Sequence, residues 1–372
     1  MTSQRGRLAA IATLALAAAC TSSPAGTASS TVTAPAVTTS TTSPGTPASA
    51  ASAAAPAPLP QGVAFWTAST GLLAVTLATP GCWLTGAPCP GGLVELTTNG
   101  GHRWRTLTTV SESATAVSTA GATVAWVSEG RCSIGVDCPA DRLLETHDRG
   151  RSWTTVRPSA PVRSVSVTSA TTAWAIDEAS RAPAPTRLVH TVDAGRSWQP
   201  VSTPCTSIGN QRLLWGVSFP TDELGWLVCI GQAEQMLQSK TVFRTTDGGA
   251  HWGIVAQSCP TSFTDGSSDG PPGSLSCIGN FPTLSLRPDG VGWLWGGRGG
   301  LHATTTNGSS WTPIARQLVV PDTTTAMAAS LTSDTRGYLL VSDGYGRALD
   351  VTRDAGLTWQ HLDSWPPPPG LR

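Results

Sequence analysis

Lysine is almost absent from this chain, which has one lysine, Lys240, against 22 arginines. Charged residues make up only 12% of the 372 residues, and the acidic and basic side chains balance to a net charge of zero. A protein that binds nucleic acid normally carries a basic face. The composition therefore gives no support to nucleic-acid binding.

The chain also lacks the residue spacings of a metal site. Its nine cysteines include no C-x-x-C pair, and its six histidines are scattered along the sequence. Structural zinc sites need such short pairs. We therefore expect no metal and no cofactor.

No apolar run is long enough to cross a bilayer as a permanent helix. Arg5 and Arg7 precede an apolar segment, Leu8 to Ala19, that has the length of a signal-peptide core. The segment ends in Leu16-Ala17-Ala18-Ala19-Cys20, which resembles the lipobox of bacterial lipoproteins. The resemblance implies that residues 1–19 are removed and that Cys20 is lipidated. An ordinary secretory signal, which would give a secreted protein, is the alternative.

Residues 20–60 are predicted to form a tether. From residue 21 onward the segment consists almost wholly of Ala, Thr, Ser, Pro and Gly and carries no charge. Such a composition cannot bury a core and favours a disordered, partly extended chain. We expect it to hold the folded domain, residues 61–372, outside the cytoplasmic membrane.

With Cys20 set aside for lipid, eight cysteines remain, an even number in a chain bound for an oxidising compartment. The shortest pairings join Cys82 with Cys89, Cys132 with Cys138, Cys205 with Cys229, and Cys259 with Cys277. We adopt these four disulfides as expectations, although sequence alone leaves the connectivity open.

An octet with the pattern Thr-x-(Asp/Asn)-x-Gly-x-x-Trp organises the rest of the chain. Five full copies begin at Thr97, Thr146, Thr191, Thr245 and Thr352, and a sixth, Thr305 to Trp311, reads as one residue shorter. Its structural positions are Asn99, Gly101, Trp104, Asp148, Gly150, Trp153, Asp193, Gly195, Trp198, Asp247, Gly249, Trp252, Asn307, Trp311, Asp354, Gly356 and Trp359.

Each octet position has a physical role in a tight turn. The Asp or Asn side chain accepts hydrogen bonds from the turn backbone, and the Gly allows a positive φ. The Trp begins the next strand and buries about 150–250 Å² of surface against a neighbouring sheet. The octet is therefore a folding motif and not a catalytic one.

The octet resembles the Asp-box, or BNR repeat, of sialidases, of the sortilin ectodomain and of photosystem II assembly-factor-like propellers. The resemblance covers residues 61 to 364 and implies an all-β fold, a β-propeller with the octet on the turn between the third and fourth strands of each blade. The octet tryptophans lie 45 to 59 residues apart, which suits propeller blades.

Two further features repeat in phase with the octet. Each unit opens with an alternating run such as Val165-Ser166-Val167, and most then carry a small residue before an aromatic, as in Ala173-Trp174. Six blades can be counted, and a seventh without the octet stays open. We place the six at residues 61–110, 111–158, 159–203, 204–258, 259–317 and 318–364.

Blade geometry places the octets on one face and the blade-to-blade and second-to-third connections on the other. All eight remaining cysteines fall in or beside connections of the second kind, so we expect this loop face, or the central channel, to bind the ligand. The candidate ligand-binding residues are Arg131, Asp177, Glu178, Trp295, Arg298, Asp343 and Tyr345.

The function expected is non-catalytic binding of an envelope protein or glycan by a lipid-anchored surface protein, with help to the assembly of a membrane complex as one form of it. A sialidase-like glycoside hydrolase is the alternative. Sialidases use an arginine cluster, an Arg-Ile-Pro motif in the first blade and a Tyr–Glu pair, and this chain has no arginine between residue 61 and Arg103. We therefore assign no catalytic residue.

Overall fold

The structure is a computed structural model that places most of the folded region. It describes residues 55–84, 87–131, 139–178, 186–206, 213–234, 237–258, 275–277, 280–297, 301–314, 325–344 and 346–368. Residues 53–372 form one compact unit. No helix within the described ranges is long and apolar enough to cross a membrane.

The described residues form six antiparallel sheets of four consecutive strands. The first three blades contain β1 (Ala57–Phe65), β2 (Gly71–Ala78), β3 (Gly92–Thr97), β4 (Arg105–Val110), β5 (Ser113–Ala120), β6 (Val124–Gly130), β7 (Arg142–Thr146), β8 (Thr154–Val156), β9 (Val162–Val167), β10 (Ala173–Asp177), β11 (Arg187–Thr191) and β12 (Gln199–Val201). The last three contain β13 (Leu213–Ser218), β14 (Gly225–Glu234), β15 (Leu237–Thr245), β16 (Gly253–Ser258), β17 (Asn280–Leu286), β18 (Gly292–Gly297), β19 (Leu301–Thr304), β20 (Thr312–Pro313), β21 (Thr325–Leu331), β22 (Gly337–Ser342), β23 (Arg347–Thr352) and β24 (Gln360–Trp365). Two short helices, α1 (Pro80–Leu84) and η1 (Pro204–Thr206), lie in connections.

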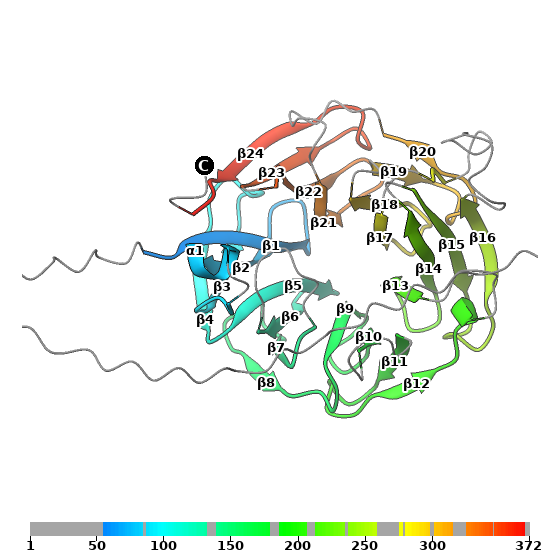
Figure 1. Cartoon of the computed structure of the whole chain (residues 1–372), viewed down its shortest axis with the longest axis horizontal. Coiled ribbons are helices and arrows are strands. Elements are labelled where there is room, and N and C mark those ends of the chain that lie inside the picture. Colours follow the sequence, from blue (N-terminus) through cyan, green and yellow to red (C-terminus); the bar gives the residue numbers. More distant parts are fainter. Residues whose placement is uncertain are drawn as a thin grey trace, which may run out of the picture. The chain divides into compact units, whose positions relative to one another are not determined.

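The six sheets are the blades of a β-propeller, as the repeats predicted. Their inner strands contact one another in the order β1, β5, β9, β13, β17, β21, and β21 contacts β1 again. Figure 1 shows these strands around the middle of the ring and the fourth strand of each blade at its rim. Among the described strands, the ring is thus closed with none exchanged between blades.

The first strand begins earlier than the sequence suggested. We expected the domain to start at residue 61, but β1 begins at Ala57 and includes Pro58 and Pro60. Proline is tolerated on a strand that has a partner on one side only, and the β1–β2 register shifts between Pro60 and Gly62. The tether therefore contributes its last residues to the first blade.

Aromatic residues of the second strands fill the layers between blades. Trp126, Trp174, Trp226, Trp293 and Tyr338 are each at most 2% exposed. A small residue precedes each of these aromatic residues, because neighbouring atoms leave little room for a larger side chain at that position. At Gly337, a Cβ would lie 2.2 Å from the Trp293 ring of the preceding blade.

The octet forms the turn between the third and fourth strands of every blade. In the third copy, the Thr191 hydroxyl donates to Asp193 Oδ1 at 2.8 Å and accepts from the Gly195 amide at 3.0 Å. Asp193 Oδ1 also accepts from the Ser197 amide at 2.8 Å. Gly195 has a φ of 71°. Side chains and glycine therefore have the roles that the pattern indicated, and the fourth strand begins just after the Trp.

The fifth-blade octet is complete, which corrects the shorter reading of the sequence. Thr304, the last residue of β19, accepts from the Gly308 amide at 3.1 Å as the first threonine of an octet does. Thr306 takes the aspartate position, because its hydroxyl accepts from the Ser310 amide at 2.9 Å. Asn307 occupies the next position, with a φ of 56°. The octet pattern does not match here because a hydroxyl replaces the carboxylate.

Octet tryptophans pack into the layers between blades. The rings of Trp198 and Trp126, which belong to adjacent blades, meet edge to face with centroids 6.4 Å apart. The ring of Trp359 packs against that of Trp293 in the preceding blade, with centroids 5.5 Å apart. Each octet therefore fastens its blade to a neighbour as well as turning the chain.

The octet carboxylates predict how stability depends on pH. Hydrogen bonds from the residue four places later hold the pKa of Asp148, Asp193, Asp247 and Asp354 at about 2, below the ordinary 3.8. The native state thus binds fewer protons than the unfolded chain, so this stabilisation is present above the ordinary pKa and is lost as the pH falls toward 2. We expect the melting temperature to fall over that interval.

A variant with asparagine at all four positions is the comparison for this acid transition. Asn99 shows that an amide fits, because its Oδ1 accepts from the Thr97 hydroxyl at 2.9 Å. The variant should lose less of its melting temperature between about pH 4 and pH 2 than the natural protein does. An equal loss in both proteins would assign the acid sensitivity to other groups.

Serines of the inner strands link successive blades. The hydroxyl of Ser166 in β9 accepts from the Phe219 amide of the next blade at 2.9 Å, and Ser218 in β13 accepts from the Leu286 amide at 3.0 Å. Ser330 in β21 accepts from the Phe65 amide of β1 at 2.9 Å. The alternation that placed serine in these strands therefore gives the ring its inner hydrogen bonds.

Among the described residues, bonds between side chains and backbone close the ring between the sixth and first blades. The Tyr338 hydroxyl donates to the Ala68 carbonyl at 2.6 Å, and its ring stacks on Phe65 with centroids 3.6 Å apart. Arg347 Nε donates to the Pro60 carbonyl at 3.2 Å. These contacts take the place of the chain connection that joins the other neighbouring blades.

Two of the four expected disulfides are present among the described residues. Cys82 pairs with Cys89 and Cys205 with Cys229, with Cα–Cα distances of 5.0 and 5.2 Å. Cys229 lies within β14 and not in a connection, so its disulfide ties the entry loop of the fourth blade to the core. Cys277 is disulfide-bonded. The expected partner Cys259, the pair Cys132–Cys138, and Cys20 lie outside the described residues.

Candidate functional site

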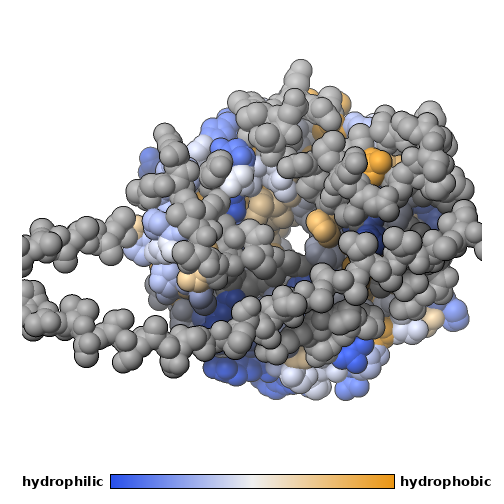
Figure 2. Space-filling view, in the orientation of Figure 1, coloured by the Kyte–Doolittle hydropathy of each residue, from blue (hydrophilic) through white to orange (hydrophobic). Residues whose placement is uncertain are grey.

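The inner strands surround a cavity of about 890 Å³ along the axis of the ring. Figure 2 shows an opening near the middle of this view, with hydrophobic residues beside it. Ligand sites are commonly concave, preformed and of this size. The cavity is therefore the candidate binding site.

Arginine supplies all of the formal charge along the described cavity lining. The residues are Arg163, Arg287 and Arg347, and the lining includes no Asp, Glu or Lys. Each guanidinium already has partners. Arg163 Nε contacts Glu178 Oε1 at 2.5 Å, Arg287 contacts Asp289 at 2.9 Å, and Arg347 donates to the Ser342 hydroxyl at 2.6 Å. The arginines are therefore fixed in place, with carboxylates beside Arg163 and Arg287 and hydroxyl and carbonyl oxygens beside Arg347.

Arg163 holds Trp215 at the edge of the cavity. Its guanidinium carbon lies 4.1 Å from the centre of the Trp215 ring, a cation–π contact. The same guanidinium donates to the carbonyls of Leu214 and Trp215 at 3.3 and 3.4 Å. These contacts run from blade three to blade four and fix both the backbone and the ring of Trp215.

Phe281 lies beside Trp215 and is 49% exposed. The two rings are tilted by 40° with centroids 4.7 Å apart, and both residues line the cavity. Phe281 has a φ of 56°, which is unusual for a bulky residue. Its amide donates to Oε1 of the buried Gln238 at 2.7 Å, which holds it in that conformation. We call Trp215 and Phe281 the aromatic platform.

Three of the charged residues predicted to bind ligand take part in three separate ion pairs. Asp177, which is buried, contacts Arg187 at 2.7 Å. Glu178 contacts Arg163, beside the aromatic platform. Arg131 has a side chain that is 74% exposed and contacts Glu112 at 2.9 Å, between the first two blades. Glu178 is thus brought to the cavity edge through Arg163.

Of the other residues predicted to bind ligand, one lines the cavity, one lies on the surface, and two lie outside the described residues. Trp295 in β18 is 4% exposed and lines the cavity. Asp343 is exposed, and its Oδ1 accepts from the Gly346 amide at 2.6 Å. Arg298 and Tyr345 lie outside the described residues.

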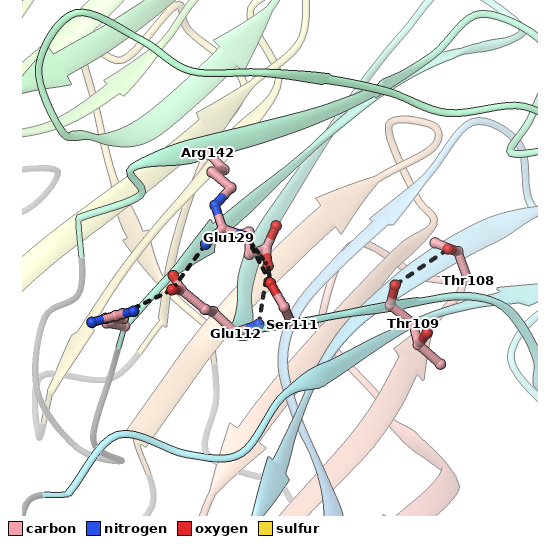
Figure 3. A network of polar contacts seen from close by, with 7 residues as sticks. Thr108, Thr109, Ser111, Glu112, Glu129 and Arg142 are labelled. Atoms are coloured by element: carbon pink, nitrogen blue, oxygen red, sulfur yellow. Dashed lines mark hydrogen bonds and ion pairs between the residues drawn. The ribbon is translucent and has the colours of Figure 1, made fainter.

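Two carboxylates do meet between the first two blades, as a glycosidase would require. Figure 3 shows Glu112 and Glu129 with Arg142, which donates to them at 2.9 and 3.2 Å. Their side chains are only 9% and 4% exposed. Glu129 also accepts from the Ser111 hydroxyl and the Glu112 amide, both at 3.0 Å. The pair therefore acts as a buried clasp and does not face the cavity.

Glu145 is a carboxylic acid with a strongly shifted pKa. Burial raises its pKa to about 7, and the residue is 3% exposed. Its Oε1 would lie 3.6 Å from a Cβ at Gly195, in the layer between the second and third blades. A shifted pKa often marks a functional group, but this acid is enclosed between two sheets.

Asp350, His361 and Ser364 stand in the order of a hydrolytic triad. His361 contacts Asp350 Oδ1 through Nδ1 at 3.0 Å and the Ser364 hydroxyl through Nε2 at 2.8 Å. A triad also needs amide donors for the oxyanion. The Ser364 amide donates to Asp363 Oδ1 at 2.8 Å, so a carboxylate already holds that donor. We assign this group no catalytic role.

No sequence pattern predicted Arg163, Trp215 or Phe281 as site residues. Each lies in an inner strand where a small or aliphatic residue is the rule, and the register shifts nearby in all three strands. An arginine or aromatic residue within these runs was the available clue.

No family model matches the chain, and no curated protein matches it. Solved structures do match. One titled YCF48 bound to D1 peptide is 17% identical over 83% of this chain and 81% of that chain, with a TM-score of 0.43. YCF48 from Cyanidioschyzon merolae is 14% identical, with 82% and 85% of the two chains covered and a TM-score of 0.45.

A GH74 xyloglucanase from Xanthomonas campestris also matches, at 13% identity and a TM-score of 0.32. The match covers 80% of this chain and 55% of the xyloglucanase. Similarity at this level is a likeness of fold alone. The six-bladed architecture rests on the structure itself.

Proposed function

We propose that this chain is a non-catalytic binding propeller whose axial cavity receives part of an envelope protein or glycan. One observation carries the proposal: the cavity holds an exposed aromatic platform that buried polar contacts fix in place. Rigid, exposed aromatic residues in a concave site are typical of ligand anchors. Holding a membrane complex during its assembly is one role that such a binder would serve.

A glycoside hydrolase is the less favoured reading. A glycosidase needs two carboxyl groups that reach the substrate. Glu112 and Glu129 are bound to Arg142 and buried, and the described cavity lining contains no carboxylate. The arrangement therefore supports binding without hydrolysis.

The proposed location is the outer side of the cytoplasmic membrane, through a lipid on Cys20 and a tether that extends to residue 56. Replacing Cys20 with alanine should move the protein from the membrane fraction to the soluble fraction, because alanine cannot carry the lipid that anchors the chain. Immunoblots of fractionated cells measure this. An unchanged distribution would refute the lipid anchor.

Cross-linking in the native envelope tests the binding function. The full-length protein is cross-linked, purified and compared with variants in which Phe281 or Leu357 is replaced by alanine. Leu357 is also exposed, at 68%, but belongs to the sixth octet. A ligand captured by the natural protein and the Leu357 variant, and lost from the Phe281 variant, is the expected result. Identical material from all three proteins would remove the cavity from the proposal.

A further inference from the structure

The aromatic platform brings an exposed aromatic side chain, Phe281, into a cavity lined by both apolar and polar residues. The large hydrophobic residues that are exposed in the described part of the chain are Val192, Leu213, Ile254, Phe281 and Leu357. Phe281 is the member of this set that lines the cavity. A protein interface usually needs a broader apolar core around its anchor residues. Within the platform, the Phe281 ring is exposed and the Trp215 ring is partly buried.

Hydroxyl groups dominate the polar part of the same cavity. Fifteen of the lining residues are serine or threonine, and the charged ones are three arginines that already have partners. Ser166, Ser218 and Ser330 bond neighbouring blades, whereas others, such as Thr283 and Ser285, are partly exposed. Such a lining can exchange hydrogen bonds with a neutral ligand without leaving a buried charge unpaired. It therefore suits a ligand with many hydroxyls better than a charged peptide.

The platform is fixed before any ligand arrives. Gln238, which is 1% exposed, accepts from the Phe281 amide through Oε1 and donates through Nε2 to the Gly231 carbonyl at 3.0 Å. Arg163 fixes the adjacent Trp215. Holding a bulky residue at positive φ costs free energy, so the surroundings must impose it. A preformed face loses little entropy on binding.

From these observations we infer that the cavity binds a glycan, with one pyranose ring stacked on the exposed ring of Phe281. An aromatic face carries negative charge and attracts the C–H groups on the apolar side of a sugar ring. The sugar hydroxyls then meet the serine, threonine and arginine side chains of the lining. This inference rests on the proposed binding function and names the ligand class for that site.

A glycan array that spans bacterial wall, capsular and plant polysaccharide fragments tests the inference with the purified full-length protein. The natural protein should be retained by at least one group of related glycans. Replacing Phe281 with alanine should weaken that retention at least about tenfold. Replacing Phe281 with tyrosine, which keeps the ring, should restore it, and Leu357→Ala should leave it unchanged.

Melting temperatures of all variants establish that each is folded before the comparison is made. Failure of every glycan to show retention that depends on Phe281 would overturn the inference. If envelope cross-linking still captured a protein through Phe281, the glycan would be wrong while the binding function stood. If neither experiment depended on Phe281, both proposals would fall.

Discussion

Replacing Tyr338 with alanine is expected to lower the free energy of unfolding by about 3–5 kcal/mol, the usual cost of deleting a buried aromatic ring. Tyr338 is fully buried and stacks on Phe65 across the junction of the sixth and first blades. The change also leaves the Ala68 carbonyl without its hydroxyl donor. Denaturant titration followed by tryptophan fluorescence measures the loss.

The matched control is Trp174→Ala. Trp174 occupies the same strand position in the third blade and stacks on Phe219 of the fourth, with centroids 4.0 Å apart. A chain segment connects those two blades, whereas none connects the sixth to the first. Hydrogen exchange should therefore show β1 and β22 losing protection locally only in the Tyr338 variant. Equal, global loss in both variants would contradict a special role for the closing interface.

Gly150→Ala is expected to destabilise the propeller by about 2–5 kcal/mol, because two costs add at this position. Its φ is 81°, which costs an alanine roughly 1–2 kcal/mol. A Cβ there would also lie 2.3 Å from Cδ1 of Leu107 in the first blade. Overpacking of this kind typically costs about 1–3 kcal/mol. Thermal unfolding of the two proteins gives the difference.

Gly121 separates these two costs. Its φ is 54°, but a Cβ there would meet nothing within 4 Å. Gly121→Ala should therefore cost only the backbone part, roughly 1–2 kcal/mol. An equal loss at both glycines would show that the octet does not dock tightly on the preceding blade.

The fold was predictable because its repeating unit carries its own local chemistry. Thr191, Asp193 and Gly195 bond within a single turn, so their spacing in the sequence reports their geometry. The period of the octet tryptophans then sets the size and number of blades. The role of Thr306 was not predicted, because its hydroxyl replaces the carboxylate while the backbone path stays the same.

The site was harder to predict because it depends on contacts between blades. Arg163 and Trp215 lie 52 positions apart and meet only when the third and fourth blades pack together. In the sequence Phe281 looks like an ordinary strand residue. In the structure it has a positive φ, is held by the Gln238 side chain and lines the cavity. Sequence patterns report local geometry, whereas this platform is made by neighbours in the ring.

The closing interface has a consequence for how the gene could be rearranged. Ser330 bonds Phe65 across that junction much as Ser166 bonds Phe219 between two connected blades. Since the junctions use the same kind of contact, the fold does not depend on which of them the backbone crosses. A circular permutant that joins the present ends and opens the chain between β8 and β9 should build the same propeller.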